Sequence, residues 1–508
     1  MKKTLFIKNA AILTASGLAL RFIGIIFKVW VSKVIGATGV GLYQMIFSVY
    51  VFASTFATSG ICTAVTRLVS ESFARKRKEY TEKYVTVALK ITLVIAFLSF
   101  LILFFFSKII AKQIIGDVLA AESIRVFSLS LFFMGGCSCF RGYFIAVSKV
   151  TPTATVQIFE QIIRISVIFV SLYTYAKNNL YLSCVSLFIG DTVSEIFGFL
   201  VLLGLYRRDF KKRIGHIGSV TSLPTSLALR QTLRIAAPIS LSRYLNSFLR
   251  TAENILTPKL LNLFYLNYNT SLSLFGMIKG MALPILLFPS TLLNSVSTLL
   301  IPEIARESAL NRKGVVKSLC EKVIRITSVL GIFCGNLFLF CGERLGIILY
   351  GNHTVGNILK LLSVIVPVMY VDSVCDGLLK GLDQQNFSFK VTVSDSTLRI
   401  LLIFIFLRYF GIMGFIGIMY FSNLYTGILN FTRLKKKTDT KIDLLRCVFI
   451  PFLSSFGILF CVTSFLKFIP TMPDLVYIIL VAVFSAAAYI LLMLKAKILV
   501  IGDIKDIV

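Results

Sequence analysis

Residues 140–165, FRGYFIAVSKVTPTATVQIFEQIIRI, are echoed by residues 375–400, CDGLLKGLDQQNFSFKVTVSDSTLRI, and this repeat decides the fold. The two stretches align without a gap. Gly142 falls on Gly377, and in both copies an acidic residue is followed four positions later by an arginine. A shorter echo precedes each copy, because LYQMI at 42–46 resembles LFGMI at 274–278. The chain is therefore predicted to contain two related halves.

Apolar segments long enough to cross a bilayer recur along the 508 residues. Hydrophobic residues make up 57% of the chain and the mean hydropathy is +0.87, which is typical of an integral membrane protein. Because a span needs about 20 mostly apolar residues, we expect an all-α protein with about 14 transmembrane helices. The expected spans are residues 8–33, 41–69, 84–106, 123–146, 152–176, 181–206, 231–257, 270–300, 323–343, 357–382, 388–408, 411–432, 447–467 and 475–496.

The two copies of the repeat are separated by an even number of these spans, so both enter the membrane in the same direction. This predicts two parallel six-helix bundles, related by an axis along the membrane normal, plus two C-terminal helices. The expected organisation is an N-terminal bundle at 1–206, a basic cytoplasmic linker at 207–230, a second bundle at 231–432, and two further spans with a short tail at 433–508.

The charges of the chain indicate its orientation. Lys and Arg number 53 against 23 Asp and Glu, a net charge of +30. Basic runs such as 75–78, 207–213 and 435–437 fall in alternate loops, which is the pattern of cytoplasmic loops. Both termini of this multi-pass protein are therefore expected to be cytoplasmic, in the cell membrane. A nucleic-acid partner is not expected, because no recognition element accompanies the basic runs.

Enzyme and metal chemistry receive little support from the sequence. The ten Cys lie mostly in apolar stretches, and only two His, His216 and His353, are present. No metal site and no cofactor are expected. The chain has no G-x-x-x-x-G-K-[ST] run, so ATP hydrolysis is not expected either.

Several motifs resemble a known family. The run Arg141-Gly142-Tyr143-Phe144, followed by Pro152-Thr153-Ala154, Gln157, Glu160-Gln161 and Arg164, is similar to the polysaccharide-exporter family that includes stage V sporulation protein B. The loop Ile35–Tyr43 resembles the same family. The sequence departs from it at Ile145-Ala146, where the family often has Gln-Gly.

This resemblance implies the multidrug/oligosaccharidyl-lipid/polysaccharide (MOP) transporter superfamily. It further implies movement of a lipid-linked, pyrophosphate-bearing sugar, a peptidoglycan or spore-cortex precursor, from the inner to the outer leaflet by alternating access. Lipid II flippases that resemble this chain keep arginines in a central cavity on their first, second and eighth helices. Arg21 and Arg67 match the first two by span, whereas Arg243 and Arg250 on the seventh match the third only approximately.

Charges inside the expected spans are costly unless they face a watered cavity. The residues Arg243, Asn246, Arg250, Glu253 and Asn254 share one helical face by their spacing. We interpret Arg21, Arg67, Arg243, Arg250 and Lys279 as pyrophosphate-binding residues, because the arginine fork suits phosphate. The alternatives are an Arg250–Glu253 ion pair, an Arg67 side chain that extends to the interface, and Lys279 on a helix bent by Pro284 and Pro289.

Acidic residues of the spans fall into two groups. Glu160 with Arg164, and Asp395 with Arg399, have the i, i+4 spacing of structural ion pairs. Asp191 with Glu195, and Asp372 with Asp376, are like-charged at that spacing and are candidates for coupling to H⁺ or Na⁺, unless Lys380 or another base neutralises one of them. Glu253 is a further coupling candidate.

The sequence thus predicts a non-enzymatic flippase for a lipid-linked oligosaccharide. Its expected partners are membrane lipids, the lipid-linked sugar pyrophosphate, an H⁺ or Na⁺ gradient and cell-wall synthesis enzymes. Three alternatives remain: a multidrug or cation antiporter of the same superfamily, a membrane glycan polymerase, and a scaffold without transport. The first fits a basic cavity poorly, and the second would need larger external loops than this chain has.

Overall fold

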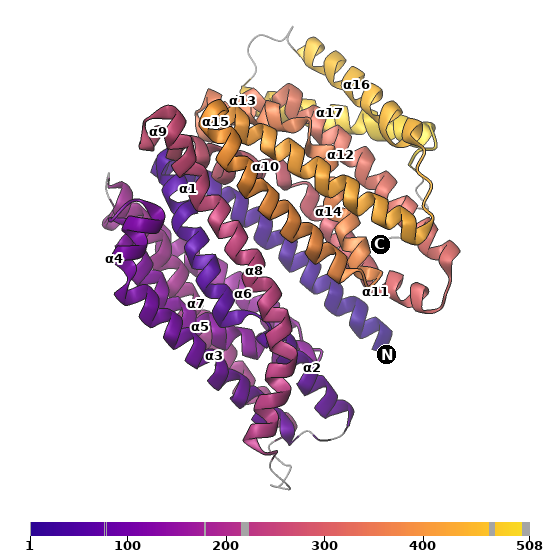
Figure 1. Cartoon of the computed structure of the whole chain (residues 1–508). Coiled ribbons are helices and arrows are strands. Elements are labelled where there is room, and N and C mark those ends of the chain that lie inside the picture. Colours follow the sequence, from indigo (N-terminus) through magenta and orange to yellow (C-terminus); the bar gives the residue numbers. More distant parts are fainter. Residues whose placement is uncertain are drawn as a thin grey trace. The chain divides into compact units, whose positions relative to one another are not determined.

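The computed structural model describes residues 2–75, 77, 79–176, 179–214, 223–466 and 473–499, and these residues form helices joined by short connections (Figure 1). The middle of the expected basic linker (215–222) and the end of the C-terminal tail (500–508) lie outside them. The elements are α1 (Lys2–Thr58), α2 (Ile61–Ala74), α3 (Tyr80–Phe105), α4 (Ser107–Ile109), η1 (Ile110–Ile115), α5 (Ala120–Ala146), α6 (Thr151–Thr174), α7 (Leu180–Ile214), α8 (Thr225–Tyr265), α9 (Tyr268–Gly276), η2 (Met277–Ala282), α10 (Leu283–Leu287), α11 (Ser290–Ala309), α12 (Lys313–Tyr350), α13 (His353–Ser363), α14 (Val366–Gly381), α15 (Gln385–Thr438), η3 (Leu445–Phe449), α16 (Ile450–Leu466) and α17 (Asp474–Lys495).

The all-α membrane architecture expected from the sequence is confirmed. Within the described residues, nine helices are long and apolar enough to cross a membrane, or up to ten if the pair α13 and α14, bent by 61°, is one span. Each expected segment falls mainly within a helix, part of a helix or consecutive helices. The count by length and composition is lower than 14 partly because α15 holds two expected spans.

Two glycines mark where one helical trace contains two expected spans. Gly36 interrupts α1 with φ 70°, and Gly411 interrupts α15 with φ 53°. Glycine adopts positive φ without the steric cost of a Cβ, so a single residue is enough to break the helix. The loop expected at residues 35–43 is therefore a helix break, and the chain continues in helical conformation on both sides.

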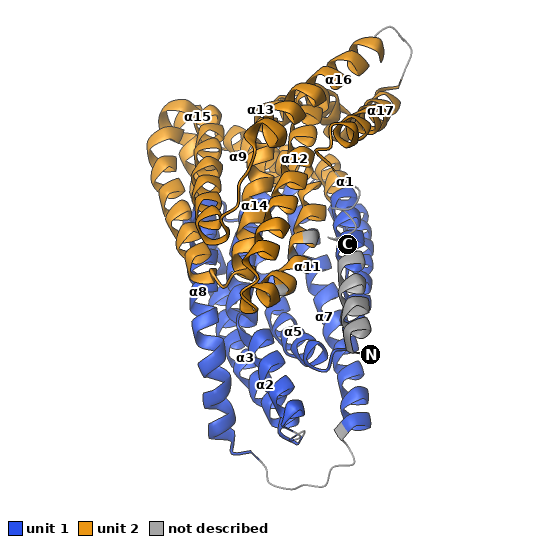
Figure 2. Ribbon diagram, turned by 90° about the vertical axis from the view of Figure 1, so that its right-hand side faces the viewer, with its two compact units in different colours: residues 1–27, 42–255 blue, residues 28–41, 256–508 orange. Residues whose placement is uncertain are grey.

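The chain divides into two compact units, coloured separately in Figure 2. Unit 1 comprises residues 1–27 and 42–255, and unit 2 comprises residues 28–41 and 256–508. The expected second bundle began at residue 231, whereas α8 as far as Ile255 belongs to unit 1. Hydrogen bonds from α8 to α1 account for this difference, as described below.

In unit 1, α5 packs against α2, α3 and α7, and α6 packs against α7. Aromatic side chains fill much of this core, with Phe140, Tyr143 and Phe144 of α5 almost completely buried. The segment between α1 and α2 touches α8 closely at Gly60, because a Cβ there would lie 2.5 Å from the carbonyl oxygen of Ala236. The repeat residues Phe140, Tyr143 and Phe144 of the first copy thus belong to the hydrophobic core of unit 1.

In unit 2, α12 packs against α13, α14, α16 and α17, while α14 also packs against α11 and α15. Residues 28–41 of α1 join this unit through two close glycine contacts with α9. A Cβ on Gly41 would lie 2.1 Å from the Leu272 oxygen, and one on Gly276 would lie 2.3 Å from the Ala37 oxygen. Small residues that let two helix backbones approach are a common basis of helix association in membranes.

Candidate functional site

Helix α8 presents a stripe of polar side chains to α1. Hydrogen bonds run from Ser240 to Ser59 O (2.9 Å), Tyr244 to Phe56 O (3.4 Å), Thr55 to Ser247 Oγ (3.2 Å), Thr251 to Ser48 O (3.1 Å) and Asn254 to Ser48 Oγ (3.0 Å). These α8 positions recur at intervals of three and four, which is the period of one helix face. The stripe fixes α8 to unit 1 and was not predicted from the sequence.

The structure divides the polar face that was expected on span 7. Asn254 belongs to the α1-facing stripe, and Glu253 is buried, with 2% of its surface exposed. Arg243 and Arg250 are exposed. Arg21 on α1 is exposed as well. The three arginines are thus exposed, whereas Glu253 beside them is buried and Asn254 is hydrogen-bonded to α1.

A pocket of about 840 Å³ lies between the α2–α3 connection and the beginning of α8. Four arginines line it: Arg67, Arg75, Arg77 and Arg234. Glu71 is the acidic lining residue, and it accepts a hydrogen bond from Arg67 Nε at 3.0 Å. Leu68, Leu227 and Ile235 are among the apolar residues of the wall. The pocket therefore combines a cationic surface with an apolar one.

Helices α3 and α8 are joined at this pocket by Tyr84, whose hydroxyl donates to Gln231 Oε1 at 2.6 Å. Of the four arginines, only Arg67 is among the residues that the sequence predicts to bind pyrophosphate. Arg75 and Arg77 were interpreted as part of a topology-determining run, and Arg234 precedes the expected stripe. Their shared pocket was not visible in the sequence because α8 lies far from α2 along the chain.

A cluster of buried charges joins α5, α6 and α7. Arg141 donates from Nη2 to both carboxylate oxygens of Glu160, at 2.9 and 2.8 Å. Arg164 Nε lies 2.8 Å from Asp191 Oδ1, and its Nη2 lies 3.8 Å from Glu195 Oε1. The three carboxylate side chains are at most 10% exposed, and the two guanidinium side chains are about a quarter exposed.

This arrangement corrects one detail of the sequence interpretation. Glu160 and Arg164 were expected to pair with each other along α6, but each is paired across helices, with Arg141 and with Asp191 respectively. The like-charged pair Asp191 and Glu195 has Arg164 beside it. The i, i+4 rule describes isolated helices, and here tertiary packing offers better aligned partners.

The second copy of the repeat keeps the local pair. Arg399 Nη2 lies 3.2 Å from Asp395 Oδ2, and Ser422 donates to Asp395 Oδ1 at 2.6 Å. Asp376 is neutralised by Lys380 at 2.5 Å, the alternative that the sequence had left open. Asp372 accepts hydrogen bonds from Thr426 (2.8 Å) and Asn430 (2.7 Å).

Lys279 lies in the π-helical turn η2 of unit 2, with its ammonium group 5.7 Å from the centre of the Phe415 ring. The chain turns at Phe288 and Pro289, between α10 and α11. A cation over an aromatic face is a stabilising contact in itself. Lys279 thus has a structural contact in unit 2, beside any contact with a cargo.

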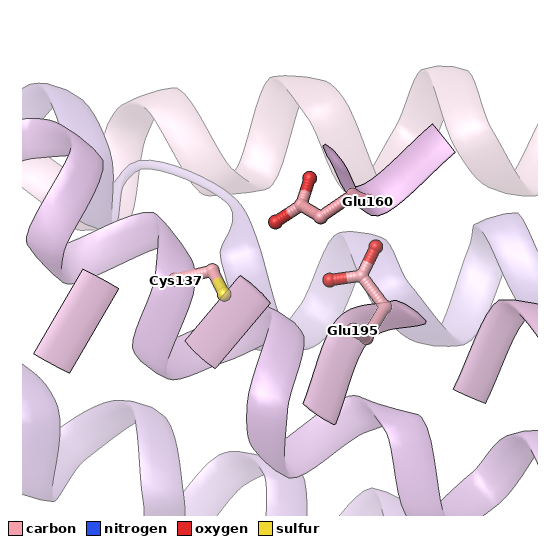
Figure 3. A group of neighbouring side chains, drawn as sticks. All are labelled: Cys137, Glu160 and Glu195. Carbon is pink, nitrogen blue, oxygen red and sulfur yellow. The ribbon is translucent and has the colours of Figure 1, made fainter. Parts of the chain in front are cut away.

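The sequence predicts no metal site, but one group of side chains in unit 1 has the spacing that could hold a metal ion. The Cys137 thiol and the carboxylates of Glu160 and Glu195 have ligand atoms within 4.8 Å of one another. Figure 3 shows these three side chains as neighbours. Both Glu160 oxygens already accept hydrogen bonds from Arg141, and a guanidinium group beside them repels a metal cation. The group is a poor metal site for this reason.

Comparison with known proteins agrees with this fold. The family model described as "Polysaccharide biosynthesis protein" matches residues 6–306. The chain is 24% identical to stage V sporulation protein B of Bacillus subtilis (strain 168) over 447 residues, which is 87% of this chain and 85% of that protein. It is 28% identical to the lipid II flippase MurJ of the same organism over 167 residues, 31% of each chain.

Solved structures show the same architecture. A lipid II flippase MurJ in an inward closed conformation matches with a TM-score of 0.70 at 13% identity, over 96% of this chain and 99% of that chain. An inward-facing multidrug resistance MATE transporter of the MOP superfamily matches with a TM-score of 0.64 at 12% identity, over 83% and 94%. The fold is that of the MOP transporters, in a multi-pass membrane protein. Within that class, the chain belongs to the polysaccharide biosynthesis protein family.

Proposed function

We propose that this protein is a flippase that moves a lipid-linked oligosaccharide, a peptidoglycan or spore-cortex precursor, from the inner to the outer leaflet by alternating access. The observation that carries the proposal is the pocket of unit 1, which is lined by four arginines and by apolar residues. A polyprenyl pyrophosphate matches both kinds of residue, because its pyrophosphate is anionic and its polyprenyl chain is apolar. The similarity to stage V sporulation protein B and to the lipid II flippase MurJ supports the same cargo class.

The arginines suit the pyrophosphate for a physical reason. A guanidinium group stays charged and can donate two parallel hydrogen bonds to a phosphate. Arg67 uses Nε for its bond to Glu71, so its two Nη groups are the ones that the cargo meets. With both termini cytoplasmic, the pocket opens toward the leaflet in which the cargo is made. Arg21, Arg243, Arg250 and Lys279 then form the later contacts of the pyrophosphate during transport.

No covalent step is needed for this movement. The protein acts by binding the charged headgroup and exposing it in turn to the two sides of the membrane, and it is not an enzyme in this scheme. Cell-wall synthesis enzymes that consume the cargo outside would remove the product and favour export.

Native mass spectrometry of the detergent-solubilised full chain tests the proposal with a purified polyprenyl-pyrophosphate disaccharide. We expect wild type to bind it, and each of the single variants Arg67→Ala and Arg234→Ala to weaken binding about 10- to 100-fold, because one charged hydrogen bond is worth about 1.5–3 kcal/mol. Arg230→Ala is the matched control, since Arg230 lies one turn before Arg234 on α8 but does not line the pocket. Arg21→Ala and Arg250→Ala probe the later contacts.

A lipophilic cation serves as the competing cargo. If the cation binds and the anionic lipid does not, the cavity selects positively charged cargo. The multidrug antiporter then replaces the flippase as the function. If the protein shortens or extends the glycan of the lipid, the non-enzymatic scheme fails. If Arg230→Ala and Arg234→Ala weaken binding of the pyrophosphate lipid equally, the pocket is not the site at which the lipid binds.

A further inference from the structure

The buried charges of α5, α6 and α7 do not balance. Three carboxylates, from Glu160, Asp191 and Glu195, lie with two guanidinium groups, from Arg141 and Arg164. All three carboxylate residues are less than 10% exposed. With every group ionised, one negative charge would remain uncompensated in an environment where an unpaired charge is expensive. A single bound cation or proton would restore the balance.

Glu195 is the carboxylate with the weakest compensation. Arg141 donates two hydrogen bonds to Glu160, and Arg164 lies at 2.8 Å from Asp191, but Glu195 is 3.8 Å from Arg164, beyond hydrogen-bonding distance. Glu195 also has a carboxylate oxygen within 4.8 Å of one on Glu160. Two carboxylates this close favour the state in which one of them is protonated.

A second observation points to the same place. Asp191 Oδ2 is buried and has no hydrogen-bond partner among the described residues, and neither has Arg141 Nε. Buried polar atoms are normally paired, so the orphaned acceptor Asp191 Oδ2 indicates that the cluster lacks a donated proton. Arg141 Nε–H is itself a donor, which an added proton does not pair.

The surroundings decide between a proton and a metal cation. The titratable or charged groups around the cluster are Tyr43 and Tyr50 of α1, Cys137 and Arg141 of α5, Glu160 and Arg164 of α6, and Asp191 and Glu195 of α7. Figure 3 shows the Cys137 side chain with its sulfur directed toward Glu160 and Glu195. Hard cations such as Na⁺ prefer several oxygen ligands, whereas here a thiol and two guanidinium groups adjoin the carboxylates. A proton needs no such shell.

We infer that Glu195, within the cluster of Glu160, Asp191, Arg141 and Arg164, holds one exchangeable proton. Binding converts the Glu195 carboxylate to a carboxylic acid and leaves two carboxylates opposite two guanidinium groups. Release returns the unbalanced negative charge to the cluster. The two arginines are partly exposed, so the cluster reaches the surface of unit 1 and the proton can exchange. That this proton drives transport rests on the proposed function.

Infrared difference spectroscopy of the full chain in lipid nanodiscs tests the site without any cargo. Protein labelled with ¹³C on its glutamate carboxyl carbons separates glutamate from aspartate. Wild type at neutral pH is expected to show the C=O band of a protonated glutamic acid, shifted by D₂O. Glu195→Gln should abolish this band while the midpoint of thermal unfolding is kept. Asp395→Asn, at the position that matches Glu160 in the repeat, should leave the band intact.

Three results would overturn the proton site. These are a band that is absent from wild type, a band that survives Glu195→Gln, and a band that disappears only in Asp191→Asn. Thermal stabilisation by NaCl, relative to choline chloride, that depends on Glu195 would assign the site to Na⁺ and also overturn it.

A transport assay then separates this inference from the proposed function. In liposomes with an imposed pH gradient, flipping of the pyrophosphate lipid by wild type should respond to the gradient, and flipping by Glu195→Gln should lose that response. If wild type moves no lipid, the proposed function fails and the infrared result still decides the proton site. Flipping by wild type that ignores the gradient would overturn the driving role of the proton.

Discussion

Both carboxylate oxygens of Glu160 accept hydrogen bonds from Nη2 of Arg141, so α6 is tied to α5 through a pair that is largely buried. A single nitrogen bridges both oxygens. Glu160 also touches α7 closely, because a Cβ on Gly198 would lie 1.9 Å from Glu160 Oε1. The pair therefore sits where three helices of unit 1 meet, and its loss should be felt in the stability of this unit.

Arg141→Met should destabilise the protein by about 3 kcal/mol, because removal of one partner leaves the Glu160 carboxylate buried without its countercharge. The measurement is the unfolding free energy in detergent, with Arg67→Ala as the control. Arg67 is 66% exposed and pairs with a 44% exposed Glu71, so its loss should cost no more than about 1 kcal/mol.

The double variant Arg141→Met with Glu160→Leu completes the cycle. It should be less destabilised than the sum of the single variants, since no charge is then left unpaired. Additive effects, or an Arg141→Met cost as small as that of Arg67→Ala, would contradict the structural role of the pair.

Gly276→Ala should lower the yield of folded protein and the midpoint of thermal unfolding. The added Cβ would lie 2.3 Å from the Ala37 oxygen and 2.6 Å from the Gly41 nitrogen, both of which are backbone atoms that cannot move aside easily. Size-exclusion profiles and thermal unfolding report the effect.

Gly417→Ala on α15 is the matched control within unit 2, because a Cβ there meets nothing within 4 Å. We expect it to be neutral or to stabilise by up to about 1 kcal/mol through helix propensity. A harmless Gly276→Ala would show that α1 and α9 are less close than described.

Asn254→Ala should destabilise the α1–α8 contact modestly, by about 0.6 kcal/mol and no more than about 1.7 kcal/mol, the range found for hydrogen bonds between membrane helices. It removes the donor to Ser48 Oγ at 3.0 Å. Asn246→Ala provides the comparison. Its Oδ1 is buried with no hydrogen-bond partner among the described residues, so its loss should cost less. A larger loss of unfolding free energy for Asn246→Ala than for Asn254→Ala would contradict the structural role of the polar stripe.

Binding of the pyrophosphate lipid should weaken as salt rises, because the pocket arginines act largely through charge and the Debye length falls from about 10 Å at 0.1 M to 3 Å at 1 M. Arg75→Gln with Arg77→Gln should reduce both the affinity and its salt dependence. Affinity measured across a series of NaCl concentrations is the readout. A flat salt profile in wild type would indicate that the apolar wall, not the arginines, holds the lipid.

The amino-acid sequence by itself determined the membrane class, the helical segments and the local Asp395–Arg399 pair. These follow from composition and from spacing along one helix, which the chain carries without reference to the rest of the fold. The glycine breaks lie at the expected span boundaries, because Gly36 falls between the spans 8–33 and 41–69 and Gly411 is the first residue of the span 411–432. The sequence alone suggested loops at these boundaries.

Only the tertiary structure decided which charges meet. Arg141 was visible in the motif but had no assigned partner, and Glu160 was given to Arg164, its neighbour on α6. The choice depends on how α5, α6 and α7 are rotated about their axes, and a rotation of one residue, about 100°, exchanges one partner for another. The same holds for Arg234, which reaches the pocket of Arg67 because the polar stripe of α8 packs on α1. Spacing along a helix specifies a face, and packing specifies what that face touches.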